Sequence, residues 1–124
     1  MANFVEVAQQ FVQFYYNTFD TNRQNLKELY GDQSMLTFET SSVLGKDAIM
    51  EKLMSLPFQK VEHVVNTLDA QPSNPNGGVL VQVTGHLKVD DEQKMSYTQT
   101  FQLIPGGQSY IVLNDIFRLV YPAA

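Results

Sequence analysis

The spacing of the apolar residues changes along the chain, and this change limits the folds that the chain can adopt. From Asn3 to Phe19, apolar side chains recur every three or four residues, which is typical of an amphipathic helix. From Gln59 onward, apolar and polar residues alternate, most cleanly over Val79–Val89, which is typical of half-buried strands. Helices followed by consecutive strands predict an α+β fold, with the helices packed on one face of a bent antiparallel sheet.

Capping and turn residues predict where the elements begin and end. Asn3, with Glu6 three residues later, is typical of a helix start, and a second short helix through Leu26, Leu29 and Tyr30 should end at Gly31. A further helix over residues 45–56 should stop at Pro57. Strands are expected over residues 34–40, 59–71, 79–89, 95–104 and 109–121, with turns over residues 72–78, 90–94 and 105–107.

Composition excludes several classes of function. The chain has 124 residues, 44% of them apolar, which is enough for one domain with an ordinary core. It has no cysteine, so disulfides, thiolate metal sites and cysteine nucleophiles are excluded. The net charge of −5 argues against nucleic-acid binding and favours a basic protein partner. No apolar run is long enough to cross a bilayer and no signal peptide is recognisable, so we expect a soluble intracellular protein without membrane insertion.

One face of the predicted sheet is too apolar for free solvent and too polar for an ordinary core. On the sequence alone this pattern fits either a symmetric dimer packed sheet to sheet or a tolerated exposed face. The residues expected on this face are Thr84, His86, Thr98, Thr100, Gln102, Tyr110, Val112, Ile116 and Arg118.

Signals for catalysis are sparse. The chain has two histidines, neither with the spacing of a metal ligand set, and no nucleotide-binding motif is present. His63 alternates with Val61 and Val65, so it points toward the concave side of the sheet. Together with Asp69 or Asp115, and with Tyr15 or Tyr16, it could compose an acid–base site. A structural histidine beside core tyrosines is the interpretation that we favour.

Four further features could bind a partner. The acidic turn Asp90-Asp91-Glu92 suits either a solvated loop or a docking surface for lysine and arginine. Glu39 ends an apolar strand, and Phe4 lies in the first turn of the first helix. A set of large apolar residues on the strands and at a helix end fits an ordinary core: Phe38, Leu56, Val61, Met95 and Phe117.

Four segments resemble the nuclear transport factor 2 family, small dimeric carriers of the GDP-bound GTPase Ran. They are QFYYNTFDTNRQNL (13–26), SMLTFET (34–40), SLPFQKVEHVVNTLDAQP (55–72) and NDIFRL (114–119), and the resemblance runs from about residue 4 to residue 119. It implies a cone-like bent antiparallel sheet with N-terminal helices on its concave face, in a single domain over residues 1–124. It also implies a carrier without enzymatic activity, cofactor or metal.

The resemblance further implies three binding surfaces. Glu39, Asp90 and Glu92 would meet basic residues of Ran, while the apolar set that includes Phe38 would wall a cavity for a phenylalanine of Ran. Here Glu92 replaces an aspartate of the family, and Phe38 replaces the tryptophan of many relatives. Phe4 would bind FxFG repeats of nucleoporins, which places the protein in the cytoplasm and nucleus, concentrated at nuclear pores. The dimer interface would include Thr84, His86, Thr100 and Ile116.

Two other functions are compatible with the same fold. One is a dehydratase or isomerase acting on a small apolar substrate, with a closed pocket around His63 and Asp115. The other is a dimeric adaptor of RNA-export machinery, which the chain end at Ala124, without an RNA-binding extension, makes less favoured.

Overall fold

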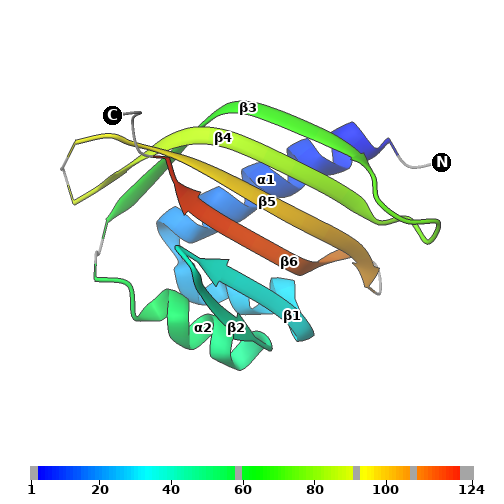
Figure 1. Ribbon diagram of the computed structural model, residues 1–124, viewed down its shortest axis with the longest axis horizontal. Coiled ribbons are helices and arrows are strands. Elements are labelled where there is room, and N and C mark those ends of the chain that lie inside the picture. Colours follow the sequence, from blue (N-terminus) through cyan, green and yellow to red (C-terminus); the bar gives the residue numbers. More distant parts are fainter. Residues whose placement is uncertain (1–2, 58–59, 91–92, 107–108, 121–124) are drawn as a thin grey trace.

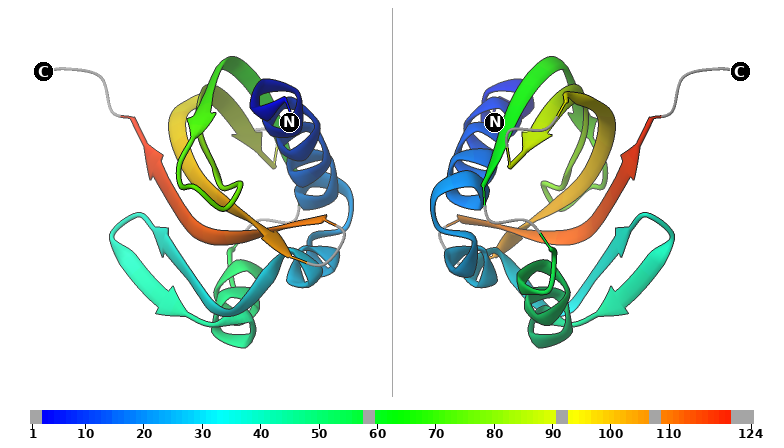
Figure 2. Two further views of the ribbon diagram at one scale, coloured as in Figure 1. Left: turned by 90° about the vertical axis from the view of Figure 1, so that its right-hand side faces the viewer. Right: turned by 90° about the vertical axis from the view of Figure 1, so that its left-hand side faces the viewer.

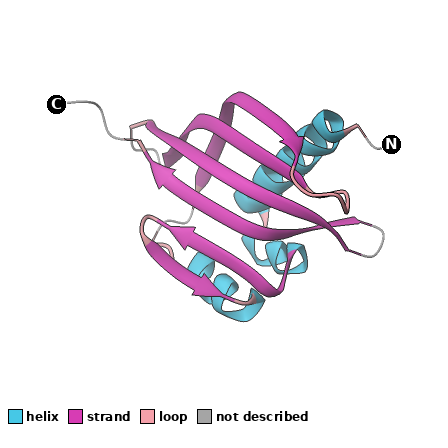
Figure 3. Cartoon of the chain, turned by 45° about the vertical axis from the view of Figure 1, so that its right-hand side comes forward, coloured by secondary structure: helices cyan, strands magenta, loops and turns pink. Residues whose placement is uncertain are grey.

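The structure is a computed structural model, and it describes residues 3–57, 60–90, 93–106 and 109–120. The chain begins with two helices and continues with strands, apart from one helix between the second and third strands (Figures 1 and 3). The elements are α1 (Phe4–Thr21), the 3₁₀ helix η1 (Arg23–Leu29), β1 (Tyr30–Phe38), β2 (Ser41–Leu44), α2 (Lys46–Met54), β3 (Val61–Pro72), β4 (Val79–Val89), β5 (Met95–Gly106) and β6 (Ser109–Leu119).

The strands form one sheet in the order β2-β1-β6-β5-β4-β3. Neighbouring strands are antiparallel except β1 and β6, which pair in parallel, as the long connection between them allows. The sheet curls around α1 without closing, as the two side views in Figure 2 show. The predicted α+β fold with helices on the concave face is confirmed, while the parallel pair was not expected.

Helix α1 begins as the sequence predicted. The Oδ1 atom of Asn3 accepts hydrogen bonds from the backbone N–H groups of Val5 (3.0 Å) and Glu6 (3.3 Å), which satisfies two otherwise unpaired donors. The helix buries one face against the sheet, but Phe14, expected in the apolar stripe, is 55% exposed. The buried side chains of α1 are those of Ala8, Val12, Tyr15, Tyr16, Thr18 and Phe19.

The boundaries of three predicted elements were wrong. The second helix ends at Leu29, and Tyr30 and Gly31 already belong to β1, where Tyr30 pairs with Val112. The extended conformation lets the buried Tyr30 hydroxyl reach Asp115. Pro105 and Gly106, which were expected in a turn, belong to β5. Strand β2, which pairs with β1 along the edge of the sheet, was not predicted.

A β-bulge in β6 overturns part of the predicted outer face. The register shifts so that Gln102 pairs with Asn114 but Leu103 pairs with Val112, which leaves Leu113 as the extra residue. Val112 is therefore fully buried, and Tyr110 packs against the core instead of facing outward. The pairings Thr84–Thr98, Thr98–Arg118 and Thr100–Ile116 remain on the outer face.

Candidate functional site

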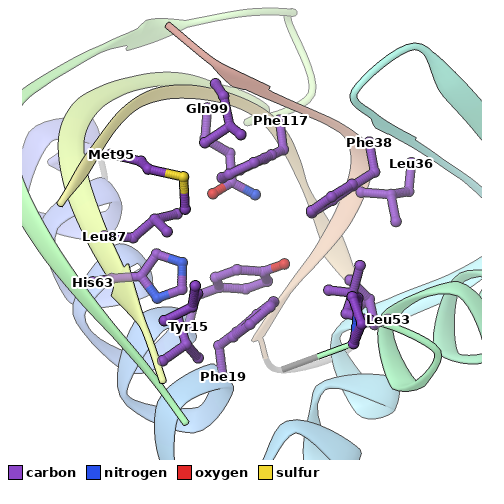
Figure 4. A pocket seen from close by; sticks show the side chains of 15 residues that line it. Tyr15, Phe19, Leu36, Phe38, Leu53, His63, Leu87, Met95, Gln99 and Phe117 are labelled. Carbon is purple, nitrogen blue, oxygen red and sulfur yellow. The ribbon is translucent and has the colours of Figure 1, made fainter. Parts of the chain in front are cut away.

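The concave side of the sheet encloses an apolar cavity of about 180 Å³ (Figure 4). The five residues that the sequence suggested as a core cluster or cavity wall lie together on its lining: Phe38, Leu56, Val61, Met95 and Phe117. The rings of Phe38 and Phe117 stack with centroids 4.7 Å apart and planes 9° apart. Helix α1 adds the rings of Tyr15 and Phe19 to the lining. The arrangement provides flat aromatic walls for an aromatic guest.

The cavity has a deep end and a mouth. Leu36, Leu53 and Tyr15 are each at most 1% exposed and form its deep end. Phe38, Leu56, Met95 and Leu119 also line the cavity but are only half-buried, so they form the mouth. An apolar group from outside would therefore enter between the ends of β1, β5 and β6 and the segment after α2.

Beneath the cavity lies a buried carboxylate, that of Asp115. It accepts hydrogen bonds from the Tyr30 hydroxyl (2.7 Å), the Tyr15 hydroxyl (3.1 Å) and the Gln99 side-chain amide (2.7 Å), and Gln99 in turn accepts one from Tyr16 (2.7 Å). Burial raises the pKa of Asp115 from its ordinary 3.8 to about 6, and the three hydrogen bonds oppose this rise. Burial likewise raises the pKa values of Tyr15 and Tyr30 well above 10.0, so both hydroxyls remain donors.

His63 lines both the cavity and a surface groove between α1 and β3. Its Nδ1 atom lies 2.6 Å from Oδ1 of Asp20, and its backbone N–H donates to Oδ2 of the same residue at 2.9 Å. The ring stacks on Tyr16, with centroids 4.5 Å apart. The acid–base partners suggested from the sequence, Asp69 and Asp115, were therefore wrong. Asp20 follows Tyr16 by one helical turn, which is the sequence signal that could have identified it.

Two predicted partner-binding carboxylates hold strand ends next to the cavity mouth. The carboxylate of Glu39 accepts a hydrogen bond from the backbone N–H of Leu119, and the Glu39 N–H donates to the carbonyl of Phe117 at 3.1 Å. Asp90 exchanges two such bonds with Lys60, each of 2.9 Å, one to its side chain and one from its backbone. Both residues have positive φ angles, 51° and 48°. The third carboxylate, Glu92, lies outside the described residues.

The other predicted surfaces lie away from the cavity mouth. Phe4 is half-buried in the first turn of α1, about 22 Å along the helix from the cavity residue Phe19. Thr84, Thr100 and Ile116 lie on the outer face of the sheet, where the Thr84 hydroxyl contacts that of Thr67 at 2.5 Å. His86 lies on the same face, with its Nδ1 atom 3.1 Å from the Asn66 side-chain oxygen.

Neither a metal site nor a membrane span stands out in the part of the chain that the structure describes. Its histidine, aspartate and glutamate residues form no group of three that could hold a metal ion. None of its helices combines the length and hydropathy needed to cross a bilayer.

Comparison with known proteins gives a consistent result. The family model described as the nuclear transport factor 2 (NTF2) domain matches residues 7–119. Nuclear transport factor 2 of Emericella nidulans is 65% identical, over 99% of this chain and 100% of its own length. The solved nuclear transport factor 2 of Cryptosporidium parvum superposes with a TM-score of 0.91 at 46% identity, covering 94% of each chain. A putative scytalone dehydratase of Novosphingobium aromaticivorans has a TM-score of 0.79 at 11% identity, covering 94% of this chain and 84% of its own, and this likeness shows the fold alone.

The high-identity relatives are named for transport, whereas the enzyme is related only by fold. Over nearly all of its length, this chain belongs to the nuclear transport factor 2 domain family.

Proposed function

We propose that the protein is a homodimeric, non-enzymatic carrier that binds GDP-bound Ran and returns it to the nucleus. The observation that carries this proposal is the apolar cavity with aromatic walls, whose mouth is flanked by the carboxylates of Glu39 and Asp90. Such a site suits an aromatic anchor on a protein with basic residues around it. The acidic loop over residues 90–92 and the net charge of −5 favour the same kind of partner.

The cavity and the carboxylates contribute differently to binding. Burying a phenylalanine side chain contributes on the order of 1.5–3 kcal/mol. An ion pair at an exposed rim contributes about 0–1 kcal/mol. The cavity walls around Phe38 and Phe117 therefore supply most of the affinity, while Glu39, Asp90 and Glu92 orient the partner and select it.

Carriage through nuclear pores requires a second, separate surface. We assign this role to Phe4, which would bind the phenylalanines of FxFG nucleoporins. Its distance from the cavity residue Phe19 leaves room for both partners at once. Weak contacts repeated along a nucleoporin permit rapid capture and release, and pairing two chains doubles their number. This assignment places the protein in the cytoplasm and nucleus, concentrated at the pores.

The test is a titration against purified Ran loaded with GDP or with a GTP analogue. Saturable binding to the GDP form, and much weaker binding to the other, is the expected result. The preference would arise in Ran, if the anchor lies in a segment that changes conformation with the bound nucleotide. Equal affinity for both forms, or binding to neither, would contradict the proposal.

A further inference from the structure

The cavity wall carries one polar atom with no hydrogen-bond partner among the described residues, Nε2 of His63. The side chain of His63 is only 3% exposed, and Figure 4 shows its ring pointing into the cavity. Nδ1 lies against the carboxylate of Asp20, which can only accept a hydrogen bond, so Nδ1 carries the proton of the neutral ring. In that neutral ring Nε2 is the acceptor, and it faces an apolar space.

The other polar groups on the described lining are already engaged within the protein. The Tyr15 hydroxyl bonds with Asp115 and Tyr30, and the Gln99 amide bonds with Asp115 and Tyr16. A water molecule in the cavity would normally need two to four polar partners, and Nε2 offers one. A molecule with one donor and an otherwise apolar body satisfies the site better than water does.

The size and walls of the cavity specify the rest of the guest. An apolar cavity of about 150 Å³ is known to hold benzene, and this cavity is slightly larger, at about 180 Å³. The stacked rings of Phe38 and Phe117 and the rings of Tyr15 and Phe19 present flat surfaces to it. The Met95 side chain adds a polarisable sulfur at the mouth. The space fits one aromatic ring or two fused rings.

We propose that the cavity is a binding site for small aromatic molecules with a single N–H or O–H donor, of the indole and phenol class, which His63 Nε2 accepts. The site requires no second protein, so this proposal stands apart from Ran binding. Only one consequence rests on the proposed function: a bound aromatic molecule would occupy the space that the anchor of a protein partner needs.

The first experiment compares ligands of one shape in the unmodified protein. Because the chain has no tryptophan, the fluorescence of added indole can be excited selectively, at wavelengths longer than those that the six tyrosines absorb. Indene and benzofuran have the same fused-ring outline without a donor, and they are measured by displacement of indole. Indole should bind about tenfold more tightly than either, the factor that a hydrogen bond of about 1.4 kcal/mol provides. Equal affinities, or no saturable binding of indole, would overturn the proposal.

The second experiment locates the hydrogen bond. With two histidines in the chain, imidazole ¹⁵N spectra contain two sets of ring signals. Indole should shift the Nε2 signal of His63 and leave the ring of His86 unchanged. His63→Phe should remove the preference for indole over indene, while the matched variant His86→Phe on the outer face should retain it. An unchanged preference in His63→Phe, or an unshifted Nε2 signal, would show that the donor is not accepted here.

A last titration separates this proposal from the proposed function. Indole is added to the protein with GDP-bound Ran present. If Ran binds, saturating indole should displace it, and undiminished Ran binding would place indole outside the cavity. If Ran does not bind at all, the carrier proposal fails, while the fluorescence and ¹⁵N results still decide whether the ligand site exists.

Discussion

At the scale of single residues, Glu39 and Asp90 each have a structural task. Both accept hydrogen bonds from backbone N–H groups, of Leu119 and Lys60, and so fix the chain beside the cavity mouth. A substitution that removes the acceptor therefore disturbs the mouth as well as the charge. The amide of glutamine or asparagine keeps the acceptor and removes only the charge.

We therefore predict that Glu39→Gln and Asp90→Asn each weaken binding to GDP-bound Ran by about fivefold or less, the contribution of a rim ion pair. Glu39→Lys should abolish binding, because it loses the acceptor and places a cation opposite the basic residues of the partner. Calorimetric titration measures the affinities, and thermal unfolding with nucleoporin binding serves as the control. Normal Ran binding by folded Glu39→Lys would show that the docking site lies elsewhere.

The buried carboxyl group of Asp115 should make the free energy of unfolding fall as pH rises. Its pKa is about 6 in the folded protein and 3.8 when the group is unperturbed, so between these pH values the folded state binds more protons than the unfolded state. This group alone therefore lowers the free energy of unfolding as pH rises from 3.8 to 6, by on the order of 3 kcal/mol in total. The free-energy cost of burying the ionised Asp115 carboxylate is fully present above pH 6 and absent below pH 3.8.

Urea unfolding at a series of pH values tests this prediction. Asp115→Asn should remove the rise in stability that the unmodified protein gains from this group as pH falls below 6. The comparison uses the slopes of the unfolding free energy against pH. Absolute stabilities would mislead, because the substitution also replaces an acceptor oxygen by a donor NH₂ group among Tyr15, Tyr30 and Gln99. Parallel pH profiles of the two proteins would show that the carboxylate is not costly to ionise in the fold.

The sequence predicted the apolar part of the site better than the polar part. Alternation along strands identifies which side chains of β3, β5 and β6 share the concave face, and this brings Val61, Met95 and Phe117 together. Hydrogen-bond partners follow no such period. Asp20 and His63 are 43 residues apart, and only the packing of α1 against β3 brings them into contact.

At the scale of elements, the β-bulge in β6 accounts for the errors in the predicted outer face of the sheet. A bulge inserts one residue and reverses which side of the sheet the following side chains face. The bulge in β6 therefore turned Val112 into the core, whereas a regular strand would have left it on the outer face. The period-2 pattern of an isolated strand carries no sign of the inserted residue, so this error could not have been avoided from alternation alone.

The bulge in β3 requires a glycine on the neighbouring strand. There the chain passes so close to β4 that a Cβ atom on Gly85 would lie 2.1 Å from the Val64 carbonyl oxygen and 3.1 Å from the Tyr97 ring. Backbone atoms cannot move aside cheaply, so Gly85→Ala should separate β3 from β4 and lower the free energy of unfolding by about 2 kcal/mol or more.

Gly31→Ala is the matched control for this prediction. The added methyl group would lie 3.8 Å from Ile111, an ordinary contact, and no positive φ angle favours glycine there. This variant should be neutral or stabilising by up to about 1 kcal/mol, because alanine restricts the unfolded chain. Chemical denaturation of both variants checks the pair, and equal stabilities would show that the two strands do not approach as closely as described.

At the scale of the whole molecule, the sheet has two faces with different surroundings. The concave face is covered by helices and holds the cavity, whereas the outer face leaves several large apolar side chains in solvent. Those exposed on β1, β2, β3 and β6 include Met35 (40%), Leu44 (60%), Val64 (44%) and Ile116 (51%). Met35 pairs with Leu44 across β1 and β2, and Ile116 pairs with Thr37 and Thr100. These pairings join apolar and hydroxyl side chains into a continuous surface that a second copy of the chain would cover.

We predict that Ile116→Glu converts a homodimer into a monomer. Ile116 lies within this surface, and in a two-fold dimer one substitution introduces two carboxylates that must both leave water. Sedimentation velocity should show a dimer for the unmodified protein and for Met54→Glu, whose substituted residue is as exposed (53%) but lies on α2, away from the outer face of the sheet. Because dimerisation stabilises the fold by mass action, the melting temperature of the unmodified protein should rise with concentration, while that of Ile116→Glu should not. A monomer at all concentrations before substitution, or a dimer that survives it, would mean that the outer face is not the interface.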